Sequence, residues 1–130
     1  MPAYDGQHFD PPAPSASVTL RNPQTGASLP DVTLLIDTGA DVSLLPSASV
    51  EQLGLKTDSA TQYELLGFDG QRSMAEAIDL DMTFLDTAIR GRYLLTGDVI
   101  GILGRDVLNF FVVVMDGPAR EWSLSKRPSN

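Results

Sequence analysis

Short apolar segments alternate with turn residues from residue 18 to residue 124, and this rhythm limits the fold more than any other feature of the chain. Each segment has the length of a strand, and Gly, Pro, Asn and Asp, which favour turns, separate them. In residues 78–84 the apolar side chains alternate with Asp79, Asp81 and Thr83. This period of two predicts a strand with one buried face and one exposed face. The chain is therefore expected to form an all-β domain.

The length of 130 residues suits one compact domain, because two separate lobes would each be too small for a substantial core. We place this domain at residues 16–125. Residues 1–15 contain four prolines and little apolar periodicity, so we expect a flexible, extended N-terminal arm. Residues 126–130 are expected to form a flexible tail.

Composition removes several classes of function. The chain has no cysteine and a single histidine, His8, which argues against thiolate chemistry, a Cys-based zinc site and a Ser–His hydrolase. A formal net charge of −8 argues against nucleic acid as a partner. No apolar run approaches a membrane span, and the N-terminus has no basic or apolar signal region, so a cytoplasmic protein is expected.

Several local elements follow from turn and helix signals. Residues 22–26 should turn a hairpin that ends at residue 36, and residues 67–70, with two glycines, should form the mobile tip of another. A helix is predicted over residues 47–53, between Pro46 and Gly54. A second helix over residues 105–109 and a last hairpin over residues 110–124 complete the prediction.

The segment 34–41 points to chemistry. Three apolar residues lead into Asp37, Thr38 and Gly39, so a carboxylate stands at the tip of a loop that a buried strand supports from behind. Such a group is open to substrate and suits a general base. The other Asp-Thr pair, at Asp86, reads better as a turn after the alternating strand.

The Asp-x-Asp pair at residues 79 and 81 suggests a metal site at first sight. Alternate strand positions would place both carboxylates on the solvent face without further ligands, however, and we favour that interpretation. No metal and no cofactor is expected.

Three motifs occur in order: the strand ending in Asp-Thr-Gly-Ala-Asp, the glycine-containing hairpin tip, and Ile-Leu-Gly-Arg-Asp at residues 102–106. Together they resemble the retroviral-type aspartic proteases, the retropepsins, over about residues 18–124. The resemblance implies a retropepsin-like closed β-sheet domain with one or two short helices, active as a symmetric homodimer. Two features depart from the retroviral pattern. The resemblance implies that residues 66–72 form the flap over the substrate, with Phe68 at its tip, and Asp69 places a charge in that tip. The last hairpin extends the C-terminus as in retropepsin-like domains of cellular proteins.

The resemblance also assigns site residues. Asp37 would be the catalytic aspartate, Thr38 the hydrogen-bond lock between subunits, and Gly39 a backbone contact for bound peptide. The substrate-binding residues would be Ala40, Asp41, Gly67, Phe68, Asp69, Gly70 and Ile102. Gly104 and Arg105 would give structural support, with Arg105 forming an ion pair to Asp41. The alternative is that Asp41 and Arg105 are unrelated surface charges, worth at most about 1 kcal/mol if paired in water.

Peptide hydrolysis by this route takes two carboxylates that share a proton, and the chain has one such loop. A homodimer that brings two copies of Asp37 together would supply both. We therefore expect an aspartic endopeptidase that acts on peptide or protein substrates. Two alternatives stay open: a dimeric module that binds peptides without cutting them, and a structural β-domain in which the Asp-Thr-Gly turn is accidental.

Overall fold

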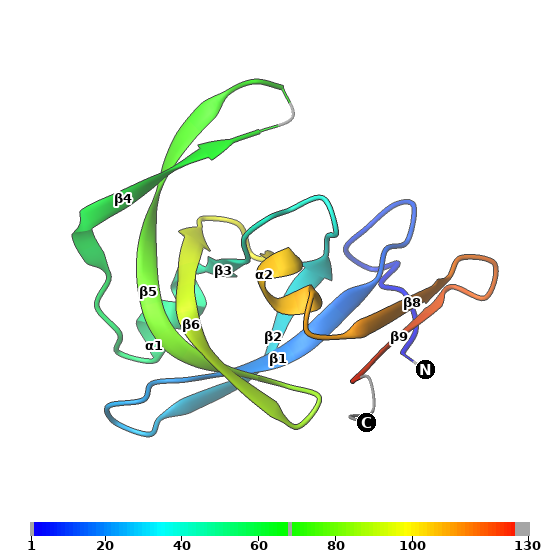
Figure 1. The fold of residues 1–130 in the computed structure, drawn as a ribbon, viewed down its shortest axis with the longest axis horizontal. Helices are drawn as coiled ribbons and strands as arrows, with labels where there is room; N and C mark the ends of the chain where they lie inside the picture. Colours follow the sequence, from blue (N-terminus) through cyan, green and yellow to red (C-terminus); the bar gives the residue numbers. More distant parts are fainter. Residues whose placement is uncertain (1, 68, 127–130) are drawn as a thin grey trace.

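The computed structural model describes residues 2–67 and 69–126, with the backbone alone described for residues 58–61. In these residues the chain forms nine strands and two short helices (Figure 1). The strands are β1 (Ser15–Arg21), β2 (Ser28–Ile36), β3 (Leu44–Pro46), β4 (Asp58–Leu66), β5 (Arg72–Phe84), β6 (Thr87–Thr96), β7 (Gly101–Leu103), β8 (Val112–Asp116) and β9 (Glu121–Ser125). The helices are α1 (Ser47–Gln52) and α2 (Arg105–Leu108). Within the described residues, no helix has both the length and the apolar character needed to cross a membrane.

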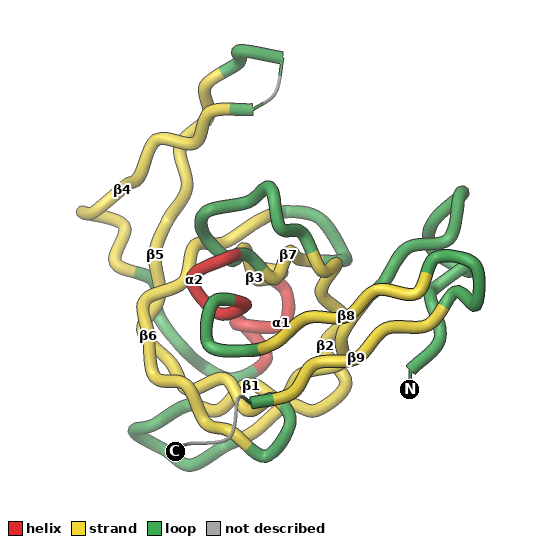
Figure 2. Tube along the Cα trace, turned by 45° about the vertical axis from the view of Figure 1, so that its right-hand side comes forward, coloured by secondary structure: helices red, strands yellow, loops and turns green. Residues whose placement is uncertain are grey.

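Six strands close into a continuous sheet. The neighbours follow the order β1, β2, β7, β3, β6 and β5, and β5 pairs again with β1. The β2–β7 and β3–β6 pairs are parallel, and the other pairs are antiparallel. Figure 2 shows the two helices lying among these strands rather than forming a separate layer. The predicted closed all-β domain with short helices is confirmed.

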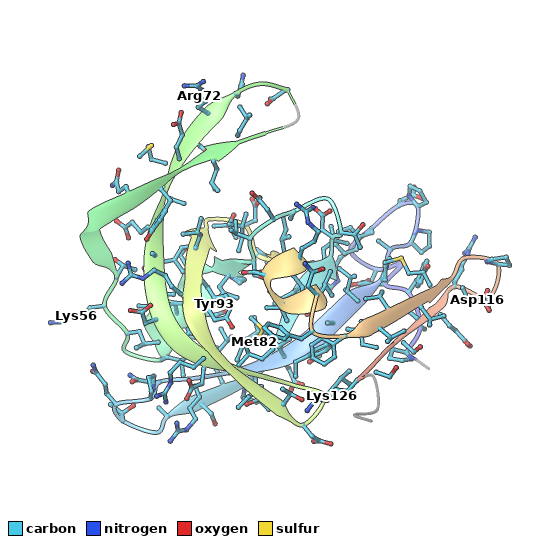
Figure 3. All side chains as sticks on the ribbon, in the orientation of Figure 1. Lys56, Arg72, Met82, Tyr93, Asp116 and Lys126 are labelled. Carbon is cyan, nitrogen blue, oxygen red and sulfur yellow. The ribbon has the colours of Figure 1, made fainter. Side chains whose placement is uncertain are left out.

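The core lies inside the closed sheet. Six large side chains with no exposed surface come from five different strands: Leu20, Leu34, Leu45, Leu80, Met82 and Leu103. Figure 3 shows Met82 in the interior, whereas Lys56 extends outward. A smaller buried cluster of Ala75, Ala77 and Leu94 packs against three partly buried residues, Val42, Leu44 and Leu65. This second cluster joins the β4–β5 hairpin to the body of the domain, through Ala75 and Ala77 on β5 and Leu65 on β4.

The local predictions for turns and helices are confirmed. β1 and β2 form an antiparallel hairpin, in which the Asn22 side chain accepts the Gln24 N–H at 2.9 Å. The first helix ends just before Gly54, whose φ of 68° suits glycine. Leu85 and Asp86 have φ values of 49° and 61° and form the turn between β5 and β6, as predicted for the second Asp-Thr pair.

The prediction that both carboxylates of the Asp-x-Asp pair face solvent is wrong for Asp81. Its side chain is 11% exposed, against 64% for Asp79. Arg90 donates to Asp81 at 2.7 Å from Nε and 3.1 Å from Nη2, and Arg21 donates at 3.3 Å. Two guanidinium groups thus cover a carboxylate that strand alternation alone would leave in water. The pKa of Asp81 is held below its usual range. The hydrogen bonds from Arg90 lower this pKa most, followed by the positive charge of Arg90 and the weaker effect of Arg21.

Two hairpins project from the closed sheet. The β4–β5 hairpin extends away from the body, and Figure 3 places Arg72 near its outer end. The β8–β9 hairpin forms a separate two-stranded sheet on the other side (Figure 1). Its first strand starts at Val112, two residues later than predicted, because α2 is followed by turns through Phe110 and Phe111.

Residues near the N-terminus lie against β9. The Trp122 N–H donates to the Pro2 carbonyl at 3.0 Å, and the Tyr4 N–H donates to the Arg120 carbonyl at 2.7 Å. A further bridge joins Asp5 and Ala13 within the segment expected to be an extended arm. Because β1 begins at Ser15, the backbone leaves this segment and enters the closed sheet at once.

Candidate active site

Asp37 stands at the carboxyl end of β2. Its N–H donates to the Leu103 carbonyl at 3.1 Å, which extends the parallel pairing of β2 with β7 by one more hydrogen bond. Behind it, Leu34 and Ile36 are buried in the core. The strand therefore fixes the backbone of Asp37 from the interior and leaves the carboxylate at the surface.

The loop after Asp37 folds back on that residue. The Ala40 N–H donates to the Asp37 carbonyl at 3.2 Å, and the Gly39 N–H donates to the Asp37 carboxylate at 2.9 Å. The side chain of Asp37 is only partly exposed, whereas Thr38 and Gly39 are exposed. One carboxylate oxygen is thus oriented by the loop, and the group remains accessible for chemistry.

The Gly-Arg-Asp segment lies directly behind this loop. The Arg105 Nη1 donates to the Thr38 carbonyl at 2.7 Å, and the Arg105 N–H donates to the Ala40 carbonyl at 2.9 Å. Among the ion pairs of the described residues, none joins Arg105 to Asp41. The predicted Asp41–Arg105 pair is therefore wrong for this chain. Arg105 reaches under Thr38 instead, and Asp41 is exposed at the rim of a cleft.

That cleft has a volume of about 530 Å³ and lies between the Asp37 loop and the β4–β5 hairpin. Six residues assigned to the site by the resemblance line it: Asp37, Gly39, Ala40, Asp41, Gly67 and Ile102. They come from the loop after β2, from β7 and from the hairpin tip. Figure 1 shows the loop and the hairpin at the same end of the molecule. The fold therefore gathers residues separated by up to 65 positions around one carboxylate, counting from Asp37 to Ile102.

The other assigned residues lie elsewhere. Thr38 is exposed beside the cleft, and its carbonyl is turned toward Arg105. Asp69 and Gly70 belong to the hairpin tip, where the Asp69 carboxylate accepts the Gln71 N–H at 3.0 Å and so stabilises the turn. Phe68, which we predicted at the tip above the substrate, lies outside the described residues.

Four cleft residues were missed at the sequence level: Val42, Leu44, Leu65 and Ser73. A fifth, Leu66, belongs to the predicted flap but was not assigned to substrate binding. Alternation along residues 42–44 would have pointed to the first two, because they flank the buried Ser43. Leu65 and Ser73 are paired across the β4–β5 hairpin. A turn at residues 67–70 is compatible with this register, so the predicted turn would have pointed to the pair. These additions make the floor and roof of the cleft largely apolar, which suits the side chains of a peptide.

Within residues 2–67 and 69–126, no group of three or more His, Asp or Glu side chains is arranged to hold a metal ion. The two carboxylates that line the cleft are Asp37 and Asp41. Asp37 is oriented by its own loop, while Asp41 sits toward the rim. The cleft of one chain thus offers a single oriented carboxylate above an apolar floor.

Comparisons with known proteins bear on the family and the fold of the chain. A family model described as aspartyl protease matches residues 26–107. Among solved structures, the EIAV protease complexed with the inhibitor HBY-793 is 25% identical, with a TM-score of 0.55 over 75% of this chain and 86% of that chain. A retropepsin-like aspartic protease from Rickettsia conorii is 19% identical, with a TM-score of 0.44 over 79% of this chain and 86% of that chain. No curated protein matches the chain. The predicted retropepsin-like fold is confirmed.

Proposed function

Since the chain belongs to the aspartyl protease family, we propose that it is an endopeptidase in which two Asp37 carboxylates, one from each copy of a homodimer, activate a water molecule. One observation carries this proposal. Asp37 is oriented in an open cleft under a projecting hairpin, and the cleft holds a single such carboxylate. The second Asp-Thr pair cannot complete it within the chain, because Asp86 lies in the β5–β6 turn. A second copy of Asp37 is the simplest source of the missing group.

The reaction then follows from the chemistry of two close carboxylates. Both cannot ionise at low cost, so the pair holds one proton between them, as aspartic proteases do. The ionised Asp37 takes a proton from water, and the water oxygen attacks the peptide carbonyl carbon to give a tetrahedral diol. The protonated Asp37 transfers its proton to the carbonyl oxygen during this attack, which completes the diol. The Asp37 that took a proton from water then gives this proton to the amine nitrogen as the C–N bond breaks. The other Asp37 takes a proton from a diol hydroxyl, so the products are a carboxylic acid and an amine, and the pair again holds one proton.

The cleft suits an extended peptide. Leu65 and Leu66 from the hairpin, and Leu44 and Ile102 from the floor, offer apolar contacts above and below. Exposed backbone of a hairpin also pairs readily with an extended chain, as in the addition of a strand to a sheet edge. We therefore propose peptides or unfolded protein segments with apolar residues at the cleavage site as substrates.

Purified protein is expected to cleave members of a diverse peptide library, and a pepstatin-type inhibitor is expected to stop the cleavage. The singly protonated pair predicts the fastest cleavage at acidic to mildly acidic pH, with a rate that falls as the pH rises past neutral. Mass spectrometry of the products would give the cleavage sites. Saturable peptide binding with no product formed at any pH would favour the alternative, a dimeric module that binds peptides without cutting them.

Replacing Thr38 by Ala is expected to weaken the dimer by about tenfold or more, because symmetry removes each hydroxyl contact twice. Thr38 is exposed in the single chain, so the change should leave the fold intact. Sedimentation equilibrium would measure the dissociation constant. Thr83→Ala, at an exposed position of β5 far from the loop in sequence, is the matched control. A monomer at all concentrations for the unaltered chain would favour the purely structural β-domain.

A further inference from the structure

Ser43 is fully buried although it follows the cleft-lining residue Val42 by one position. Its Oγ donates to the Asp106 carboxylate at 2.7 Å and accepts the Gly104 N–H at 3.0 Å. Its backbone N–H donates to the other Asp106 oxygen at 3.0 Å, and its carbonyl accepts the Leu94 N–H at 3.3 Å. Every polar atom of Ser43 therefore has a partner. Loss of the hydroxyl would leave the buried N–H of Gly104 unsatisfied.

The backbone around these contacts is closely packed. A methyl group built on Gly104 would lie 2.7 Å from the Val42 carbonyl oxygen and 2.9 Å from the Ala40 carbonyl oxygen. The segment that follows Asp37 thus rests directly on the backbone of Gly104. A small shift of one segment must be transmitted to the other, because close-packed backbone transmits strain.

The Ser43 contacts complete a series that begins at Asp37. At the start of the loop, the Asp37 N–H donates to Leu103, and at Thr38 the carbonyl accepts from Arg105. At the far end, Ser43 is clamped by Gly104 and by both oxygens of Asp106. The loop is therefore held to the 103–106 segment at both ends. At the Ser43 end of the loop, the Asp106 carboxylate accepts both of these hydrogen bonds, from the Ser43 hydroxyl and from its N–H.

From this geometry we infer that Ser43 and Asp106 are positioning residues, which hold the loop so that the Asp37 carboxylate is placed to meet its copy and the substrate. The inference rests on the proposed function, because it concerns the placement of that catalytic group. Neither side chain needs to touch substrate for this role. Their effect on rate follows from the steep dependence of catalysis on the position of the reacting group.

Ser43→Ala is expected to lower kcat by about tenfold or more while KM changes by less than about twofold, because the loss falls on placement rather than on binding. Ser43→Thr keeps the hydroxyl and should keep kcat within about threefold of the unaltered protein. Hydrogen exchange at the Gly39 and Ala40 amides should be about tenfold faster in Ser43→Ala, as expected for a loosened loop. The kinetic measurements are made at protein concentrations well above the dissociation constant of the dimer.

Val18→Ala is the control for a general loss of stability, since Val18 is buried in the core on β1 and away from the loop. Ser43→Ala with unchanged kcat, or with a loss no greater than that of Val18→Ala, would overturn the inference. If Ser43→Ala does not fold, Asp106→Ala decides instead, because it removes both acceptor oxygens at an exposed position of α2, and an unchanged kcat there would also overturn the inference. If the unaltered protein cleaves nothing, the proposed function fails, and the amide exchange of residues 39 and 40 still tests whether the pair holds the loop.

Discussion

Asp37→Asn is expected to lower peptide cleavage by about three orders of magnitude or more while the fold and the dimer persist. The amide has nearly the shape of the carboxylate and is still able to accept the Gly39 N–H that the carboxylate accepts at 2.9 Å. It cannot take a proton from water, however, and symmetry removes this ability from both halves of the site at once. Cleavage rates measured on the best library peptide, with circular dichroism and sedimentation for fold and assembly, would test the prediction.

Asp86→Asn is the matched control, because Asp86 also precedes a threonine but lies in the exposed β5–β6 turn. Its cleavage rate should stay within about twofold of the unaltered rate. Mixing subunits adds a test of the shared site. With a roughly ninefold excess of Asp37→Asn subunits, most unaltered subunits pair with an inactive partner, and activity per unaltered subunit should fall about tenfold. Cleavage that survives in pure Asp37→Asn protein would sink the mechanism.

Gly101→Ala is expected to cost about 3 kcal/mol or more of unfolding free energy, which corresponds to a fall in Tm on the order of 10 °C. Gly101 lies in β7, between β2 and β3. A methyl group there would collide with the Leu44 carbonyl oxygen and would lie 2.6 Å from Leu34 Cδ2. The carbonyl belongs to a neighbouring strand and cannot rotate away, so the closed sheet itself must deform. Thermal and urea unfolding would measure the loss.

Gly97→Ala is the control for this variant, because a methyl group built at Gly97 has no atom within 4 Å beyond those of Gly97 and its two chain neighbours. Its unfolding free energy should change by less than about 0.5 kcal/mol. Since β7 also carries the cleft residue Ile102 and the Leu103 carbonyl that accepts from Asp37, Gly101→Ala should lower activity together with stability. A Tm for Gly101→Ala equal to that of Gly97→Ala would contradict the close packing of β7.

Local patterns predicted the elements well where the evidence was local. The β1–β2 hairpin, helix α1 before Gly54 and the β4–β5 hairpin each carry their own turn or capping residues, and each formed as predicted. Two predictions failed where a long-range partner decided the outcome. Strand alternation placed Asp81 in water, but Arg21, 60 positions away, and Arg90 cover it. The resemblance paired Arg105 with Asp41, but the guanidinium donates to the Thr38 carbonyl.

The sequence by itself predicted the family and the all-β class, and it singled out Asp37 as the carboxylate to test, because an Asp-Thr-Gly loop after an apolar strand is a short-range pattern. The tertiary structure alone decided which side chains surround Asp37. Val42, Leu44 and Leu65 line the same cleft as Ile102. The Ser43 hydroxyl donates a hydrogen bond to Asp106, which is 63 positions away in the sequence. These contacts between distant residues depend on closure of the sheet, which pairs β2 with β7 and β3 with β6 although long stretches of chain separate them. The periodicity of apolar residues predicts whether a side chain faces the core or the solvent, but it does not predict which distant strand lies beside it.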